Sequence, residues 1–389
     1  MSGATTELSL STAVDSDDNA DYLTIALANS LRTVDALFNN DTGHTHSGAH
    51  QGGPIGAIPV GSIPDGSITS AKIQDGTIAT ADLANNAVTN AKLGTDTARL
   101  NLLTNGGFEI WQRGNGPFTA NGAYSADRWL PSLAGTDTIS ISSNAANIDI
   151  ASALCAAVTF TLGTGAGGSA LVQILRENAA PGVNGKTITF SVRARTSTAN
   201  AVRAALYNGS AWTYGAYHSG GGAYETLSVS LFISGGPSSI WVGPSFAASC
   251  TAYIDNAMLV LGSVPADYAP LHPADDLARC LRYYESVSCT NNGAMLPAMA
   301  YGAANAQFLW SFKVAKAVAP TITSTPAGQA ALLSATGTAL TATAVDSFVA
   351  NPGQAQGRVA VASGLVAGNA TQVIAGSGTS AILWAESNP

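Results

Sequence analysis

The sequence is poor in charge. Asp, Glu, Lys and Arg make up 10% of its 389 residues, against about 25% in an ordinary soluble domain. The formal net charge is −8, so no basic surface is expected for nucleic acid or anionic lipid. No apolar run reaches the roughly 18 residues that a membrane-spanning helix needs. No basic segment followed by an apolar one stands at the N-terminus, so no secretion signal is expected.

Cysteine is scarce as well. The four cysteines, Cys155, Cys250, Cys280 and Cys289, fit neither a disulfide framework nor a paired-cysteine metal site. We therefore expect buried thiols.

The common catalytic motifs are also missing. The chain has no G-x-S-x-G elbow and no HExxH helix, and neither a convincing helix nor a lysine follows its glycine-rich stretch at 163–168. We predict no catalytic residue, no enzymatic activity and no organic cofactor. Two carboxylates that meet only in the folded chain stay an open alternative.

Small residues are abundant instead. Forty-one glycines stand among many Ala, Ser, Thr and Asn residues, a composition that favours short strands and tight turns over long helices. We predict a mainly β protein. Strand-like segments separated by Gly and Asn turns predict a β-sandwich, or jelly roll, over 100–271. A short helix within 272–286 and further short strands predict a second, small β domain over 272–389.

The first hundred residues are organised differently. We predict an N-terminal region, residues 1–53, with a helix within 21–40 and a loop that contains three histidines. A repeat follows at 54–99. Its clearest part, residues 54–93, is called the pentad segment here, because a large aliphatic residue occupies every fifth position: Ile58, Ile63, Ile68, Ile73, Ile78, Leu83, Val88 and Leu93.

A period of five fits neither a helix nor a plain strand. One aliphatic residue in five cannot form a core within a single chain of this length. A solenoid of about two turns would be too short for stability. Three copies wound around a common axis would share one core made of the eight aliphatic residues, and we favour this trimeric shaft.

Three motifs together resemble bacteriophage tail-fibre and receptor-binding proteins. The motifs are Gly43-His44-Thr45-His46, the repeat "DGSITSAKIQDGTIATADL", and "NLLTNGGFEIWQRG" with "YSADRW", "YIDNAML" and "LARCLRYYE". The resemblance implies a homotrimer in the virion tail, with the N-terminal region attached to other tail or baseplate proteins. It also implies a carbohydrate-binding jelly roll.

The family's HxH motif implies a metal ion on the threefold axis, held by two histidines of each chain. His44 and His46 point the same way if the chain is extended. Three chains then supply six nitrogens, a set suited to iron or another divalent transition metal. A solvent-exposed polar loop is the alternative, and we assign His50 to the loop.

The resemblance also implies a structural calcium where the first and last strands of the jelly roll meet. Glu109 and Asp255 occupy such positions, and calcium prefers oxygen ligands. Alternatively, the two carboxylates accept backbone hydrogen bonds.

Aromatic residues cluster in a glycine-rich stretch. The stretch contains Tyr207, Trp212, Tyr214, Tyr217 and His218, of which Trp212, Tyr214 and Tyr217 are the candidate contacts, because sugar rings stack on aromatic faces. We predict a glycan contact here, with a place in the core or at the trimer interface as the alternative. Trp111 and Trp129 are predicted to be packing residues.

The function predicted from the sequence is a tail fibre or appendage that binds a host surface polysaccharide. Two alternatives remain: a collar, baseplate or decoration protein without host binding, and a tailspike-type depolymerase.

Overall fold

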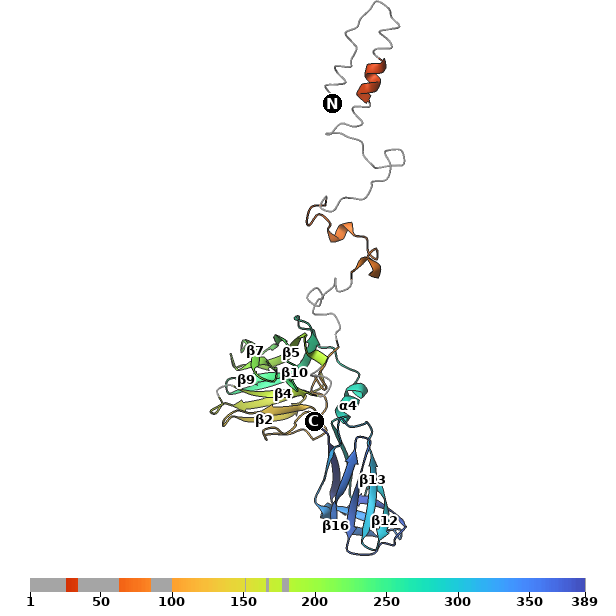
Figure 1. The fold of residues 1–389 in the computed structure, drawn as a ribbon. Helices are drawn as coiled ribbons and strands as arrows, with labels where there is room; N and C mark the ends of the chain where they lie inside the picture. The colour runs from red at the N-terminus through yellow and green to blue at the C-terminus, as the bar shows by residue number, and fades with distance from the viewer. Residues whose placement is uncertain are drawn as a thin grey trace, which may run out of the picture. The chain divides into compact units, whose positions relative to one another are not determined.

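The computed structural model of the chain describes residues 26–33, 63–84, 100–150, 152–165, 168–176 and 182–388. The chain divides into two compact units, residues 1–84 and 85–389. Strands dominate the second unit (Figure 1), which confirms the mainly β prediction. Within the described residues, no helix combines the length and the hydrophobicity needed to cross a membrane. The domain boundaries expected after residues 53, 99 and 271 stay predictions.

In the first unit, residues 26–33 are helical, inside the range predicted from the sequence. The hydroxyls of Ser30 and Thr33 donate to the carbonyls of Ala26 and Asn29, one turn earlier, each at 2.9 Å. The two polar side chains are thus satisfied by the helix itself.

The described part of the pentad segment repeats its backbone every ten residues. Two short 3-10 helices, η2 (Ser70–Lys72) and η3 (Thr80–Asp82), start ten residues apart. A turn precedes each helix, and its glycine, Gly66 or Gly76, has a φ of 75° or 77°, a conformation that glycine adopts without steric cost. The backbone period is therefore two pentads, which the five-residue aliphatic pattern alone did not predict.

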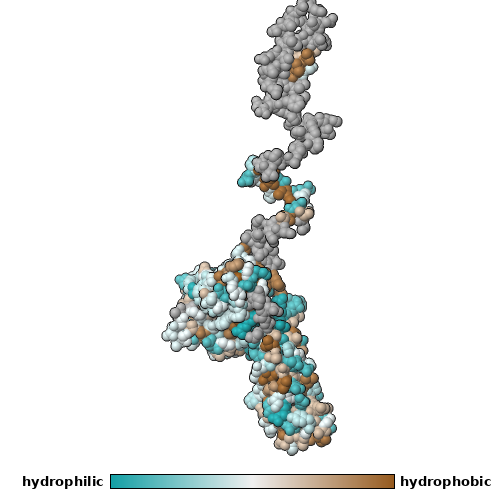
Figure 2. Space-filling model, viewed as in Figure 1, coloured by the Kyte–Doolittle hydropathy of each residue, from teal (hydrophilic) through white to brown (hydrophobic). Residues whose placement is uncertain are grey.

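The aliphatic row of this segment is exposed in the single chain (Figure 2). The exposed fractions are 44% for Ile63, 55% for Ile68, 40% for Ile73, 53% for Ile78 and 45% for Leu83. Ile58, Val88 and Leu93 lie outside the described residues. The single chain buries none of the described members, so residues 63–84 form no core of their own.

The second unit begins with a β-sandwich of two five-stranded antiparallel sheets. The first sheet has the order β1 (Trp129–Ser132), β4 (Ser169–Leu175), β9 (Ile240–Phe246), β6 (Val202–Tyr207) and β7 (Trp212–Tyr217). The second has the order β2 (Thr138–Asn144), β3 (Cys155–Thr161), β10 (Cys250–Leu261), β5 (Thr187–Thr196) and β8 (Tyr224–Phe232). This arrangement confirms the predicted sandwich.

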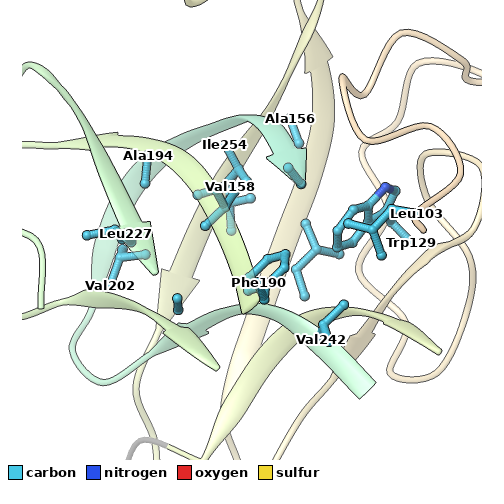
Figure 3. Close-up of a cluster of buried hydrophobic side chains, with 14 of the residues drawn as sticks. Leu103, Trp129, Ala156, Val158, Phe190, Ala194, Val202, Leu227, Val242 and Ile254 are labelled. Atoms are coloured by element: carbon cyan, nitrogen blue, oxygen red, sulfur yellow. The ribbon is translucent and has the colours of Figure 1, made fainter. Parts of the chain in front are cut away.

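Apolar side chains from both sheets fill the space between them (Figure 3). Trp129 is completely buried and stacks on Phe108, with 4.6 Å between the ring centroids. The indole nitrogen of Trp111 donates to the Phe108 carbonyl at 2.6 Å. Both tryptophans are therefore packing residues, as predicted. The thiols of Cys155, Cys250 and Cys280 are buried, while that of Cys289 is partly exposed.

The C-terminal part starts with helix α4 (Pro273–Leu281), whose N-cap His272 accepts a hydrogen bond from Ala274. A three-stranded sheet follows, made of β11 (Tyr284–Thr290), β19 (Ser380–Glu386) and β14 (Thr321–Ser324). The other strands close a barrel in the order β12 (Ala294–Gly302), β13 (Asn305–Ser311), β17 (Gln354–Val361), β16 (Ala339–Asn351), β15 (Ala330–Leu333) and β18 (Ala370–Ala375). The 3-10 helix η5 (Ala327–Gln329) precedes β15.

The barrel and the three-stranded sheet share one apolar core, separate from that of the sandwich. Polar and aromatic contacts join the two parts. The Arg113 guanidinium pairs with Glu386 at 2.7 Å and lies 3.7 Å from the centre of the Tyr284 ring. Arg128 donates to the Asn388 side chain at 2.6 Å. The end of the chain is thereby fixed against the sandwich.

Candidate carbohydrate-binding face

The first sheet of the sandwich has an inner face and an outer face, because side chains alternate along each strand. On β6, Val202, Ala204 and Leu206 point into the sandwich core. Arg203 and Tyr207 therefore point outward. The side chains on the outer face therefore take no part in the sandwich core.

The strand register places aromatic residues side by side on this outer face. Ile174 on β4 pairs with Trp241 on β9, Trp241 pairs with Tyr207 on β6, and Tyr207 pairs with Trp212 on β7. The Tyr207 ring lies 5.3 Å from Trp212 and 5.7 Å from Trp241, centroid to centroid. Four neighbouring strands therefore contribute one continuous row of apolar side chains.

A second set of contacts runs along β7. The rings of Trp212 and Tyr214 are 6.3 Å apart and nearly parallel, at 12°. The Arg203 guanidinium lies 3.5 Å from the centre of the Tyr214 ring and 4.8 Å from that of Tyr217. These cation–π contacts hold the tyrosines in place. We call Trp212, Tyr214, Tyr217, Tyr207, Trp241 and Arg203 the aromatic face.

Two polar atoms of this face have no hydrogen-bond partner among the described residues. They are Nε of Arg203 and Oγ of Ser245, and the two residues are register partners on β6 and β9. Both atoms are buried, and buried polar atoms without a partner are uncommon in proteins. The aromatic face therefore combines flat apolar rings with polar groups in its floor.

The structure brings together the three aromatic residues predicted from the sequence. Trp212 and Tyr214 are partly buried and Tyr217 is 39% exposed, and all three belong to the aromatic face. Trp241 and Arg203 were not predicted, although each lies in a strand-like segment, whereas Tyr207 already stands in the aromatic stretch found in the sequence. Their alternation with the buried apolar residues of β6 and β9 is the signal that could have placed them on the outer face.

The carboxylates of Glu109 and Asp255 accept backbone hydrogen bonds. This is the alternative to a calcium site that the sequence left open. Asp255 is completely buried and accepts from the backbone nitrogens of Asp149 at 3.0 Å and Asn256 at 2.8 Å. Glu109 accepts from the backbone nitrogen of Ala153 at 2.7 Å. Burial raises the pKa of Asp255 to about 6.

The metal predictions find no further support in the described residues. No three of their His, Cys, Asp and Glu side chains are grouped as a metal site, so calcium at Glu109 and Asp255 stays a prediction. His44, His46 and His50 lie outside the described residues, and the axial metal stays a prediction too.

No protein-family model matches the chain, and no curated protein matches it. Among solved structures, the chain is similar to the CBM22-1 xylan-binding domain of Paenibacillus barcinonensis Xyn10C, with 13% identity and a TM-score of 0.31 over 43% of this chain and 97% of that one. For the CBM22-1–CBM22-2 tandem of the same protein, the identity is 10% and the TM-score is 0.30, over 74% of this chain and 97% of that one. For a CBM4 structure, the identity is 15% and the TM-score is 0.26, over 41% of this chain and 98% of that one. All three TM-scores are below 0.5, so the ligands of these proteins say nothing about this chain, whose candidate binding face is defined by its own residues.

Proposed function

We propose that this protein is a homotrimeric phage tail fibre or tail appendage that binds a host cell-surface glycan. The observation that carries the glycan part is the aromatic face. Its rings come from three neighbouring strands and lie on the side of the sheet that faces away from the sandwich core.

The chemistry of the aromatic face fits a sugar chain. The C–H face of a pyranose ring packs against an aromatic ring, and polar groups nearby fix its hydroxyls. Trp212, Trp241 and Tyr214 supply rings, and the partly exposed Arg203, whose guanidinium lies on the Tyr214 and Tyr217 rings, supplies a polar group. Sugars bind such surfaces without any chemical step, so the proposal includes no catalysis.

The pentad segment supports the trimeric part of the proposal. Its five described aliphatic residues are each at least 40% exposed in the single chain, a pattern that leaves one apolar row uncovered along the segment. Two further copies of the same row would cover it. Three aromatic faces on one stalk would then act together, so a weak interaction at each site gives strong attachment.

A glycan array with the full chain tests this function, and titration calorimetry with the best-binding oligosaccharide follows. Trp212→Ala combined with Trp241→Ala should weaken binding by roughly 10- to 100-fold, because each removes a stacking surface worth about 1 kcal/mol or more. Tyr301→Ala, an exposed aromatic on β12 of the barrel, is the matched control and should change nothing.

The outcomes separate the alternatives. A full chain that binds no glycan on the array favours a structural protein of the virion without host contact. Release of oligosaccharides from the bound polysaccharide would indicate a depolymerase. Glycan binding that survives the double tryptophan substitution would show that the aromatic face is not the site.

A further inference from the structure

The first sheet of the sandwich carries a single charge. Its five strands, β1, β4, β9, β6 and β7, contain Arg203 and no Asp, Glu or Lys. Their one side-chain amide, Gln173, alternates with the outward Val172 and Ile174 and bonds to the backbone of Thr104 instead. The outer face of this sheet therefore has a positive charge and neither a carboxylate nor an amide beside it.

Nothing in the described part of the chain neutralises this charge. No described carboxylate forms an ion pair with Arg203, whereas Arg113 and Arg193 of the same sandwich pair with Glu386 and Asp149. No described residue accepts a hydrogen bond from Arg203 either, and of its three nitrogens only Nε is buried. The two terminal nitrogens are therefore exposed donors without an acceptor among the described residues.

The tyrosines of β7 fix the position of the guanidinium. It lies 3.5 Å from the centre of the Tyr214 ring and 4.8 Å from that of Tyr217. Stacking uses the flat faces of a guanidinium, while its N–H groups point outward in the plane. Arg203 is thus held in one orientation with its N–H edge free, and a preorganised group loses less entropy when a ligand binds.

The other exposed polar atoms of the aromatic face are mostly donors as well. Trp241 and Tyr207 already donate within the protein. The indole nitrogen of Trp212 and the terminal nitrogens of Arg203 can only donate, while the hydroxyls of the two β7 tyrosines can donate or accept. A sugar hydroxyl needs acceptors as well as donors, but an ionised carboxylate or sulfate only accepts. The donor-rich face therefore fits a ligand rich in acceptors.

We propose that the aromatic face binds an acidic polysaccharide, in which a carboxylate or sulfate ester of one sugar contacts the terminal nitrogens of Arg203. The proposal rests on the proposed glycan-binding function and names the class of glycan. The rings of Trp212 and Tyr214 pack against the C–H faces of the adjoining sugars. A carboxylate takes two parallel hydrogen bonds from one guanidinium. Because Arg203 is partly buried, salt screens this attraction less than at a fully exposed site.

A glycan array with neutral, carboxylated and sulfated glycans tests the proposal on the full chain, and it also shows which anionic group is preferred. We expect the best-binding glycans to be anionic. Titration calorimetry then compares the best ligand with its neutralised form, in which the carboxyl group is reduced to an alcohol or the sulfate is removed. The neutralised form should bind roughly tenfold more weakly or worse.

Substitutions at Arg203 locate the anionic group. Arg203→Met removes the charge but keeps an apolar stem on Tyr214, so it should weaken the anionic ligand roughly tenfold or more and leave the neutralised ligand unchanged. Arg203→Lys keeps the charge without the two-pronged geometry and should weaken the anionic ligand less. Arg358→Gln, at a barrel arginine paired with Asp346, is the control and should change neither affinity.

The outcomes keep this proposal apart from the proposed function. Neutral glycans as the best ligands, or an anionic ligand whose affinity does not depend on Arg203, would overturn the acidic class and leave glycan binding intact. An equal loss of both ligand forms in Arg203→Met would show that Arg203 only positions the tyrosines, and would overturn the charge contact. A chain that binds no glycan at all would overturn the function itself.

Discussion

Replacing both Ile68 and Ile78 by Asp should separate the proposed trimer into single chains. The two residues stand ten positions apart, at equivalent places in the backbone repeat, and are 55% and 53% exposed in the single chain. Burying a whole isoleucine side chain is worth about 1.5–3 kcal/mol, so covering the exposed half contributes about 1 kcal/mol. Six such side chains in a trimer contribute about 6 kcal/mol, or roughly a 10⁴-fold change in the dissociation constant.

The assay is light scattering on a sizing column, with the full chain at several concentrations. The wild type should elute as a trimer, and the double variant as a monomer at the same concentration. Ser70→Asp combined with Thr80→Asp is the matched control, because it adds the same two charges at the pentad position where Asp65 and Asp75 already stand. A monomeric wild type, or a double variant that remains trimeric on dilution, would refute the shared core.

The remaining predictions concern the tryptophans, a buried carboxylate and the histidines. The Trp212 and Trp241 substitutions should lower glycan affinity without moving the thermal unfolding midpoint of the sandwich by more than a few degrees, and a large shift would mean that they are core residues. The pKa of Asp255 rises from its ordinary value of 3.8 to about 6, so its stabilising contribution is complete below about pH 4 and is lost as the pH rises through 6, roughly 3 kcal/mol in all. Urea unfolding should be measured for the wild type and Asp255→Asn at pH 4 and at pH 7. The free energy of unfolding of the wild type, relative to that of the variant, should fall by about that amount from pH 4 to pH 7. An unchanged difference would contradict the pKa shift. Replacing His44 and His46 by Ala should remove bound transition metal and the sensitivity of the thermal midpoint to chelator, whereas wild-type protein that contains no metal by elemental analysis would exclude the axial site.

Much of the fold could be predicted from local sequence. Small and β-branched residues with regular Gly and Asn turns predicted the sandwich, and the short helix predicted within 272–286 is α4. Trp111 and Trp129 were expected to pack, and both do. These predictions succeed because apolar alternation, turn residues and helical spacing are each visible within a short window of the sequence.

The candidate site could be predicted only in part. Trp212, Tyr214 and Tyr217 lie on one strand, so a short sequence window shows them together. Trp241 joins them because β9 lies between β4 and β6, and strand order depends on the whole fold. Tyr207 lies five residues before Trp212, on the preceding strand that pairs with β7, so the same short window contains it.

Two other features, the Arg113–Glu386 pair and the hydrogen bonds of Asp255, could not be predicted from local sequence either. Arg113 meets Glu386 across nearly the whole second unit, and no local pattern indicates that pair. Asp255 accepts backbone hydrogen bonds from Asp149 and Asn256, and a backbone donor leaves no mark in the sequence. A motif can show that a carboxylate is present, but not which hydrogen bonds it already makes.

The two periods of the pentad segment restrict how its length can change. Gly66 and Gly76 repeat the turn every ten residues, while the aliphatic row repeats every five. Deleting five residues would preserve the apolar row but align a turn of one part with a 3-10 helix of the next. Deleting ten would preserve both. Insertions and deletions that keep the segment intact should therefore come in tens, so that related segments differ in length by whole decapeptides.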